Sequence, residues 1–166
     1  MIETIVMGPD MWQAARRQVV TSDVEEASFF LARPHGTLLE CYAMRCVEAA
    51  GFEHQTDAHI ALTDGLSAEL IQWAAGESAC LVELHSHGGN YPACMSPTDL
   101  VGLGDWVPHV RWRLGGVPYA ALVQARTSID GLTWSGGRGP AALRGVEIKD
   151  LGLVAATGLS FERWHA

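Results

Sequence analysis

Two histidines one residue apart, His85 and His87, are followed at once by a glycine pair. The apolar residues Leu81, Val82 and Leu84 predict a buried strand that ends at the histidines. Side chains two apart in a strand share a face, so both imidazoles are expected side by side. Imidazoles are good zinc ligands, and a catalytic zinc needs three protein ligands and one open position. By itself, the pair also fits two core or edge histidines that bind no metal.

A third ligand is available from the segment Ser96-Pro97-Thr98-Asp99, which opens a predicted helix. Asp99 would supply a carboxylate oxygen from a neighbouring element. The same four residues also form a helix-capping pattern with proline at the first helical position. Both roles can hold at once, because Ser96 can cap the helix while its hydroxyl faces a water on the metal. Cys94, in the loop after the histidines, is an alternative further ligand.

A zinc hydrolase also needs a carboxylate that moves protons. Zinc lowers the pKa of its water from about 16 toward 7, and a base must take that proton and pass it to the leaving amine. Glu25 and Glu26 precede an apolar strand and are both candidates, although one of them must be an exposed charge. Glu83 shares the predicted face of the histidines and lies deeper in the fold. It is expected to contact the side of an imidazole that faces away from the metal.

The elements that position these residues follow from the spacing of apolar residues. Helices are expected from Pro9 to about Thr21 with Val19 on the apolar face, over Ser67–Ala75, and from Ser96 until Pro108 kinks or ends it. The expected strands are Thr4–Met7, Ala27–Ala32, Leu38–Ala49, Ile60–Leu62, Cys80–His87, Tyr119–Ala125, Ile129–Trp134, Leu143–Ile148 and Leu153–Ala156. The glycine-rich stretch Ser135–Ala142 is predicted to be a mobile loop. This order predicts an α/β fold with one mixed sheet flanked by helices.

The bulk properties indicate a single folded domain over residues 1–166, with 48% hydrophobic and 18% charged residues. No apolar run is long enough to span a bilayer. The first residues lack the basic and apolar regions of a secretory signal, so we expect a cytoplasmic location and no membrane partner. A net charge of −8 disfavours nucleic acid as a partner. The four cysteines form no CxxC pair and are expected to be reduced and mostly buried.

Taken together, the candidate metal ligands and the candidate base resemble the JAMM motif of the JAB/MPN metalloproteases. That motif is an upstream Glu, then H-x-H, a loop, and S-x-x-D. The stretch from Glu25 to Ala32 is similar to the family's strand E-x-x-(small)-L-L-x-G, with Ser28 as the small residue, which favours Glu25 over Glu26. The resemblance covers the chain to about residue 136.

The sequence departs from the family pattern at three places. The loop 88–95 has eight residues, one more than usual, Gly88 replaces the usual proline, and Ala32 replaces the usual glycine. The longer loop leaves its local path and the role of Cys94 open.

The resemblance implies a curved mixed sheet between helices, the MPN/JAB architecture of the cytidine-deaminase-like class. It implies a Zn²⁺ ion bound by His85, His87 and Asp99, with Glu25 as general base and then general acid. Ser96 would donate a hydrogen bond to the developing oxyanion. Family members cleave the isopeptide or peptide bond after the C-terminal Gly-Gly of a ubiquitin-like protein. The short chain is similar to prokaryotic members found beside E1-like and E2-like genes, some of them in anti-phage systems.

Two other functions fit parts of the sequence. A non-catalytic MPN scaffold would only bind a partner protein, but such scaffolds lack parts of the motif. A base or nucleoside deaminase needs H-x-E and P-C-x-x-C, whereas this chain has Pro92-Ala93-Cys94 without the second cysteine.

Overall fold

The structure is a computed structural model that describes residues 1–137 and 139–166, and the backbone alone for residues 18–21. Two predictions therefore fall in part outside the described residues: position 138 of the Ser135–Ala142 loop, and the Val19 side chain on the first helix. No helix in the described ranges is both long and apolar enough to cross a bilayer.

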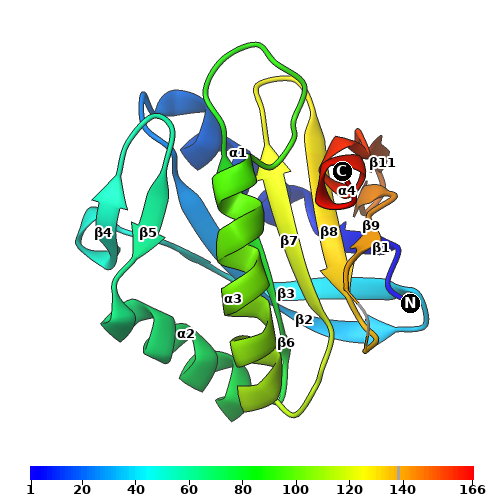
Figure 1. The fold of residues 1–166 in the computed structure, drawn as a ribbon. Coiled ribbons are helices and arrows are strands. Elements are labelled where there is room, and N and C mark those ends of the chain that lie inside the picture. The colour runs from blue at the N-terminus through cyan, green and yellow to red at the C-terminus, as the bar shows by residue number, and fades with distance from the viewer. Residues whose placement is uncertain (138) are drawn as a thin grey trace.

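Nine strands of the described chain form one sheet in the order β11-β10-β1-β3-β2-β6-β7-β8-β9 (Figure 1). They are β1 (Thr4–Met7), β2 (Ala27–His35), β3 (Leu38–Cys46), β6 (Cys80–Ser86), β7 (Tyr119–Gln124), β8 (Ile129–Trp134), β9 (Ala141–Ala142), β10 (Gly145–Ile148) and β11 (Gly152–Ala155). The pairs β1–β3, β1–β10 and β6–β7 are parallel and the others antiparallel, so the sheet is mixed. Ile129 of β8 bridges Ala156 just after β11, so the sheet curls until β8 reaches the segment that follows the edge strand β11.

Helices cover both faces of this sheet (Figure 1). They are α1 (Pro9–Thr21), α2 (Asp64–Gly76), α3 (Pro97–Arg113) and α4 (Leu159–Trp164). Alternation along β2 sends Phe29 and Leu31 into the core under α2, α3 and α4, and Phe30 and Ala32 into the core under α1. The predicted α/β fold, with a curved mixed sheet flanked by helices, is confirmed.

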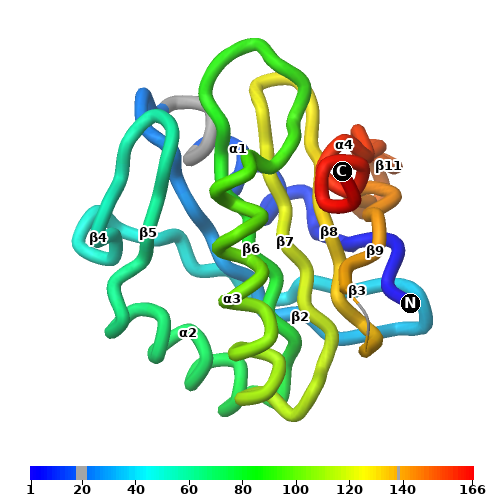
Figure 2. The backbone as a smooth tube through the Cα atoms, viewed as in Figure 1, coloured from blue at the N-terminus to red at the C-terminus, as the bar shows by residue number. Residues whose placement is uncertain are grey.

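A second, two-stranded sheet stands beside the main one. A 3₁₀ turn at Ala49–Gly51 leads into β4 (Phe52–Gln55), which pairs with β5 (Ile60–Leu62). Figure 2 follows this hairpin between β3 and α2, with its turn at the same end of the molecule as the loop after β6. The sequence predicted β5 but not β4, whose central residues are exposed and carry no apolar alternation.

Several predicted boundaries differ from the structure, as where the strand predicted over Leu38–Ala49 ends at Cys46, and three differences show a direct physical reason. β2 continues through Pro34 to His35, because both residues pair with the start of β3 across a turn at Gly36, where φ is +62°. α3 does not end at Pro108, since Pro108 is exposed and the buried side chains before and after it hold the helix to the sheet. Ala141–Ala142, predicted as loop, forms β9 against β8.

Candidate metal centre

His85 and His87 stand where β6 ends, on the face of the sheet that α3 covers. His85 pairs with Ala27 of β2 on one side and with Val123 of β7 on the other. His87 follows the last strand residue, but its N–H still donates to the Gln124 carbonyl at 2.9 Å. Because the sheet holds both backbones, alternation brings the two Nε2 atoms to 3.2 Å from each other. The imidazoles therefore lie side by side, as the HSH spacing predicts.

Asp99 reaches these histidines from the first turn of α3. Its Oδ2 atom lies 3.1 Å from His87 Nε2 and 3.5 Å from His85 Nε2. The same oxygen accepts a 2.6 Å hydrogen bond from the Ser96 N–H, while the Asp99 N–H donates to Ser96 Oγ at 3.2 Å. Ser96 and Asp99 thus form a capping box. The capping contacts and the contacts with the imidazoles coexist on one carboxylate.

These three residues form a donor set for a metal. Their ligand atoms all lie within 4.8 Å of one another. His85 is only 7% exposed, and His87 and Asp99 are half-buried. Two imidazole nitrogens and a carboxylate oxygen are ligands that divalent metals prefer. The His85, His87 and Asp99 group can therefore bind a metal ion.

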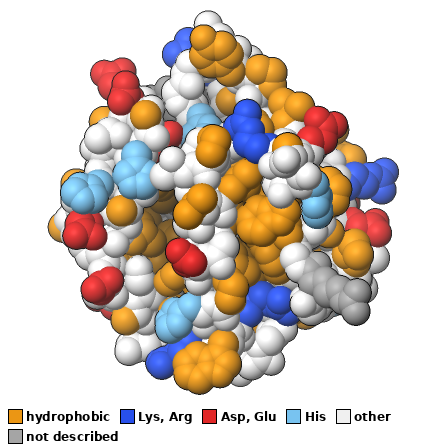
Figure 3. Space-filling model, viewed as in Figure 1, with side chains coloured by type: hydrophobic (Ala, Val, Ile, Leu, Met, Phe, Trp, Pro, Cys, Tyr) orange, Lys and Arg blue, Asp and Glu red, His pale blue; other side chains and the backbone are white. Residues whose placement is uncertain are grey.

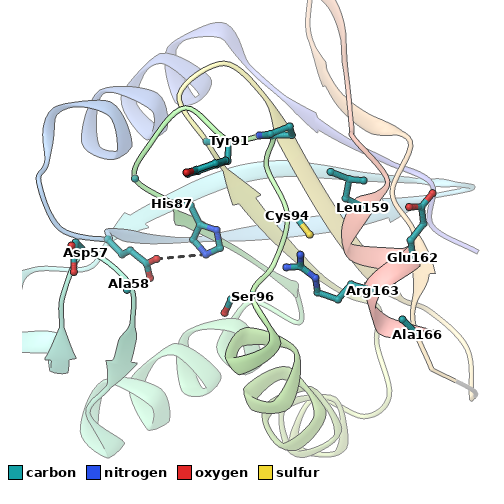
Figure 4. A pocket seen from close by; sticks show the side chains of 14 residues that line it. Asp57, Ala58, His87, Tyr91, Cys94, Ser96, Leu159, Glu162, Arg163 and Ala166 are labelled. Atoms are coloured by element: carbon teal, nitrogen blue, oxygen red, sulfur yellow. Dashed lines mark ion pairs between the residues drawn. The ribbon is translucent and has the colours of Figure 1, made fainter.

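Glu25 lies opposite His87, where β2 begins. Its Oε1 atom is 3.6 Å from His87 Nε2, and Figure 4 draws this ion pair as a dashed line. The side chain is 3% exposed, and Oε2 has no hydrogen-bond partner in the described part of the chain. Strand alternation turns the neighbouring Glu26 away, and its N–H donates to Ser86 Oγ at 2.8 Å. The structure thus brings Glu25, and not Glu26, to the histidines.

Burial and mutual contacts shift the pKa values of the group. Burial raises the pKa of Glu25, and the nearby His87 and His85 offset this only in part. Burial also works to raise the pKa of Asp99, but its contacts with His85 and His87 outweigh it and hold that pKa below its usual range. For His85, burial opposes the charged form, yet the contact with Asp99 raises its pKa. Protonation of His85 would therefore compete with metal binding up to a higher pH than for an ordinary histidine.

The group opens into a cleft of about 750 Å³. His87, Glu25 and Ser96 line it on the side of the sheet and α3. The turn after β4, the loop after β6 and helix α4 supply the other walls (Figure 4). Ser96 Oγ accepts the capping bond, which leaves its own O–H able to donate into the cleft.

One part of this cleft, helix α4, was missed in the sequence. Leu159, Glu162 and Arg163 of α4 line it, but a helix of six residues is too short to show a repeating apolar face. Cys94 also lines the cleft, with its Sγ donating to the Met95 carbonyl at 3.5 Å. Among the described residues, the group of metal-ligand atoms does not include Cys94.

A second, smaller hollow of about 320 Å³ lies on the other side of His85 and Asp99, between α3 and β5. Hydrophobic side chains gather on both flanks of α3 (Figure 3). Glu83 lines this hollow on the same face as the histidines, as strand alternation predicts. It accepts a hydrogen bond from the Tyr119 hydroxyl, which itself accepts one from Trp106 Nε1 at 2.8 Å. The hydrogen-bond partner of Glu83 is therefore Tyr119, and within the described part of the chain no hydrogen bond or ion pair joins Glu83 to an imidazole.

One solved protein structure has a similar fold. The solution structure of protein DSY2949 from Desulfitobacterium hafniense is similar, with a TM-score of 0.56, 10% identity, and 87% of this chain and 94% of that chain covered. No protein-family model matches this sequence, and no curated protein matches it. At 10% identity the likeness concerns the fold alone, so function has to be derived from the site.

Proposed function

We propose that the protein is a zinc-dependent amide hydrolase of the JAB/MPN type, with the JAMM residues as its site. The observation that carries the proposal is the spacing of the three ligand atoms. In a tetrahedral site with bonds of about 2.0–2.1 Å, neighbouring ligand atoms lie about 3.3 Å apart. The separations here are 3.2, 3.1 and 3.5 Å. The donor set supports zinc, because a carboxylate with two imidazoles on neighbouring elements leaves one position open.

A zinc ion held there would act as a Lewis acid and make water a nucleophile at neutral pH. Glu25 takes a proton from the attacking water as the water oxygen bonds to the amide carbon. The C–N bond then breaks, and Glu25 returns that proton to the leaving amine. Ser96 donates its O–H to the carbonyl oxygen as that oxygen gains negative charge. The products are a carboxylic acid and an amine.

The buried Glu25 carboxylate favours catalysis over the non-catalytic scaffold. A buried carboxylate oxygen without a hydrogen-bond donor lowers stability, and Glu25 Oε2 has no such donor in the described residues, although Oε1 lies 3.6 Å from His87 Nε2. A scaffold gains nothing from that arrangement, whereas a base needs one oxygen free to accept a proton.

The substrate assignment is the part of the proposal that depends on motif resemblance. We propose an amide bond after the C-terminal Gly-Gly of a ubiquitin-like protein, with E1-like and E2-like proteins as partners in the same cytoplasmic system. The MPN arrangement itself is supported by the order of elements, since H-x-H lies at the end of β6 and S-x-x-D at the start of α3.

The test combines metal analysis with a cleavage assay. We expect about one zinc per purified chain and hydrolysis of a fusion that extends a ubiquitin-like protein beyond its Gly-Gly. Glu25→Gln should keep zinc and lose hydrolysis, while the matched variant Glu26→Gln should keep both. Less than roughly half a zinc per chain and no cleavage of any such fusion would rule out the proposal. Retained hydrolysis in Glu25→Gln would remove Glu25 from the mechanism.

A further inference from the structure

Helix α4 is fixed against the floor of the cleft by hydrogen bonds from distant parts of the chain. Ser160 Oγ accepts from the Met95 N–H at 2.9 Å, and the Thr157 hydroxyl donates to the Ala93 carbonyl at 2.7 Å. Asp130 of β8 accepts from two backbone N–H groups at the start of the helix, at 2.9 and 2.7 Å. The helix therefore presents its side chains to the cleft from a rigid position.

Arg163 projects from this helix into the cleft. Its guanidinium is directed at the space between Cys94 and Ser96 (Figure 4). Nη1 donates to the Met95 carbonyl at 2.6 Å, which orients the group. A guanidinium has five N–H donors, so this bond leaves others available to a ligand.

The charges around the cleft make Arg163 distinctive. Among the described residues that line it, Glu25, Asp57 and Glu162 are carboxylates, and Arg163 is the only arginine or lysine. Arg163 is itself exposed, and the apolar residues Pro92, Leu159 and Ala125 line the cleft with it. A lone oriented guanidinium in such a place is suited to bind an anion.

We propose that Arg163 binds a carboxylate of the substrate next to the amide bond that is cleaved. This inference rests on the proposed hydrolase function, and it adds a substrate class: amides with an acidic side chain or a free chain terminus beside that bond. Arg163, Ser96 and His87 line one cleft, so a single ligand can reach all three. A carboxylate fits better than a phosphate, because the three lining carboxylates repel a second negative charge.

The test uses hydroxamates, which bind zinc directly and need no known substrate. One pair of probes is succinyl hydroxamate joined to glycine or to glycinamide, which places a carboxylate or an amide at a chain terminus. The second pair is succinyl hydroxamate joined to aspartic acid amide or to asparagine amide, which makes the same exchange in a side chain. The affinity of each probe is measured by calorimetry for the zinc-loaded wild type, Arg163→Gln and Arg113→Gln.

Arg163→Gln keeps an N–H donor for the Met95 carbonyl and removes the charge, and thermal unfolding checks that it folds. Arg113 is the matched control, because it is an exposed arginine in the last turn of α3. That position is roughly 25 Å along the helix from Ser96.

We expect the carboxylate member of at least one pair to bind about tenfold more tightly than its amide in the wild type and in Arg113→Gln. Arg163→Gln should bring the two affinities together, and the pair that shows the effect identifies a terminal or a side-chain carboxylate. Equal affinities within both pairs, or a preference that persists in Arg163→Gln, would overturn the role of Arg163 and leave the zinc hydrolase standing. If neither pair binds because the chain takes up no zinc, the hydrolase proposal fails and the inference with it.

Discussion

The buried Glu25 carboxylate is expected to lower the stability of the metal-free protein at neutral pH. Burial raises its pKa above the ordinary value of 4.5, so the folded state holds this proton more tightly than the unfolded chain does. Stability therefore falls as pH rises through the raised pKa. We expect metal-free Glu25→Gln to be more stable than the wild type by about 1 kcal/mol at neutral pH, measured by urea unfolding. The difference should shrink near pH 4.5.

The control for this prediction is Glu26→Gln, which changes a half-buried neighbour whose side chain lies on the other side of the strand. It should leave stability within about 0.5 kcal/mol of the wild type. A Glu25→Gln variant less stable than the wild type at neutral pH would show that the carboxylate has a stabilising partner. With zinc present, the same substitution should lower the hydrolysis rate by about 10²–10⁴, so stability and activity move in opposite directions.

Asp99 and Ser96 share a capping box, but only Asp99 belongs to the ligand group. Asp99→Asn keeps an oxygen that can accept the Ser96 N–H and removes the charge, so it should weaken zinc binding by at least about 100-fold. Ser96→Ala removes the cap at a cost of about 1 kcal/mol and leaves all three ligands in place. Titration against a zinc chelator separates the two variants. Equal losses of zinc affinity would mean that the cap, and not the carboxylate charge, holds the metal.

At the scale of elements, helix α4 depends on one buried carboxylate. Asp130 is fully buried, and its two oxygens accept from the Gly158 and Ser160 N–H groups. Asp130→Ala would leave these donors without a partner and should cost about 2–4 kcal/mol, seen by urea unfolding. Hydrogen exchange should accelerate selectively over residues 157–166, because the helix would detach before the sheet unfolds. Uniform exchange over the whole chain would contradict this attachment.

The parts of the site that lie on long regular elements could be predicted from the sequence. Alternation along β6 places His85 and His87 on one face, and the capping pattern places Asp99 in the first turn of α3. That Asp99 meets the histidines depends on how α3 packs on the sheet, which the residues alone do not determine. The motif resemblance provided that expectation, and it also favoured Glu25, which the register of β2 and β6 places opposite His87.

The remaining parts escaped prediction because their structure depends on distant contacts. β4 has exposed central residues and is a strand only because β5 pairs with it. α4 is a short helix held by Asp130 and Met95, which are far from it in the sequence. Pro108 was expected to kink or end α3, but the helix continues to Arg113, because the buried Val107 and Val110 hold it to the sheet on both sides of the missing N–H.

For the whole molecule, zinc should act as a stabilising ligand whose effect depends on pH. It would join β6 to α3 through His85, His87 and Asp99, which the unfolded chain cannot bring together. At a free concentration of 100 times the Kd, binding adds about 2.7 kcal/mol to the free energy of unfolding. Because the pKa of His85 is raised, the imidazole keeps its proton to higher pH, and zinc must displace it. The stabilisation should therefore grow as pH rises through that pKa.

Unfolding by heat over a series of zinc concentrations and pH values measures this linkage. His85→Ala is the variant to compare, since it should lose the zinc-dependent shift at every pH. A shift that is independent of pH, or that survives in His85→Ala, would place the metal elsewhere in the molecule.

The walls of the cleft and its metal-ligand group come from different parts of the architecture. The ligand group and Glu25 are anchored to β2, β6 and α3, whereas the walls come largely from the short β4–β5 turn, the loop after β6 and helix α4. The ligand group and most of the cleft walls therefore belong to separate segments of the chain. A randomised library confined to residues 56–59 and 159–166 would diversify what enters the cleft without altering the ligand group, which makes those two segments the natural targets for directed evolution of new specificity.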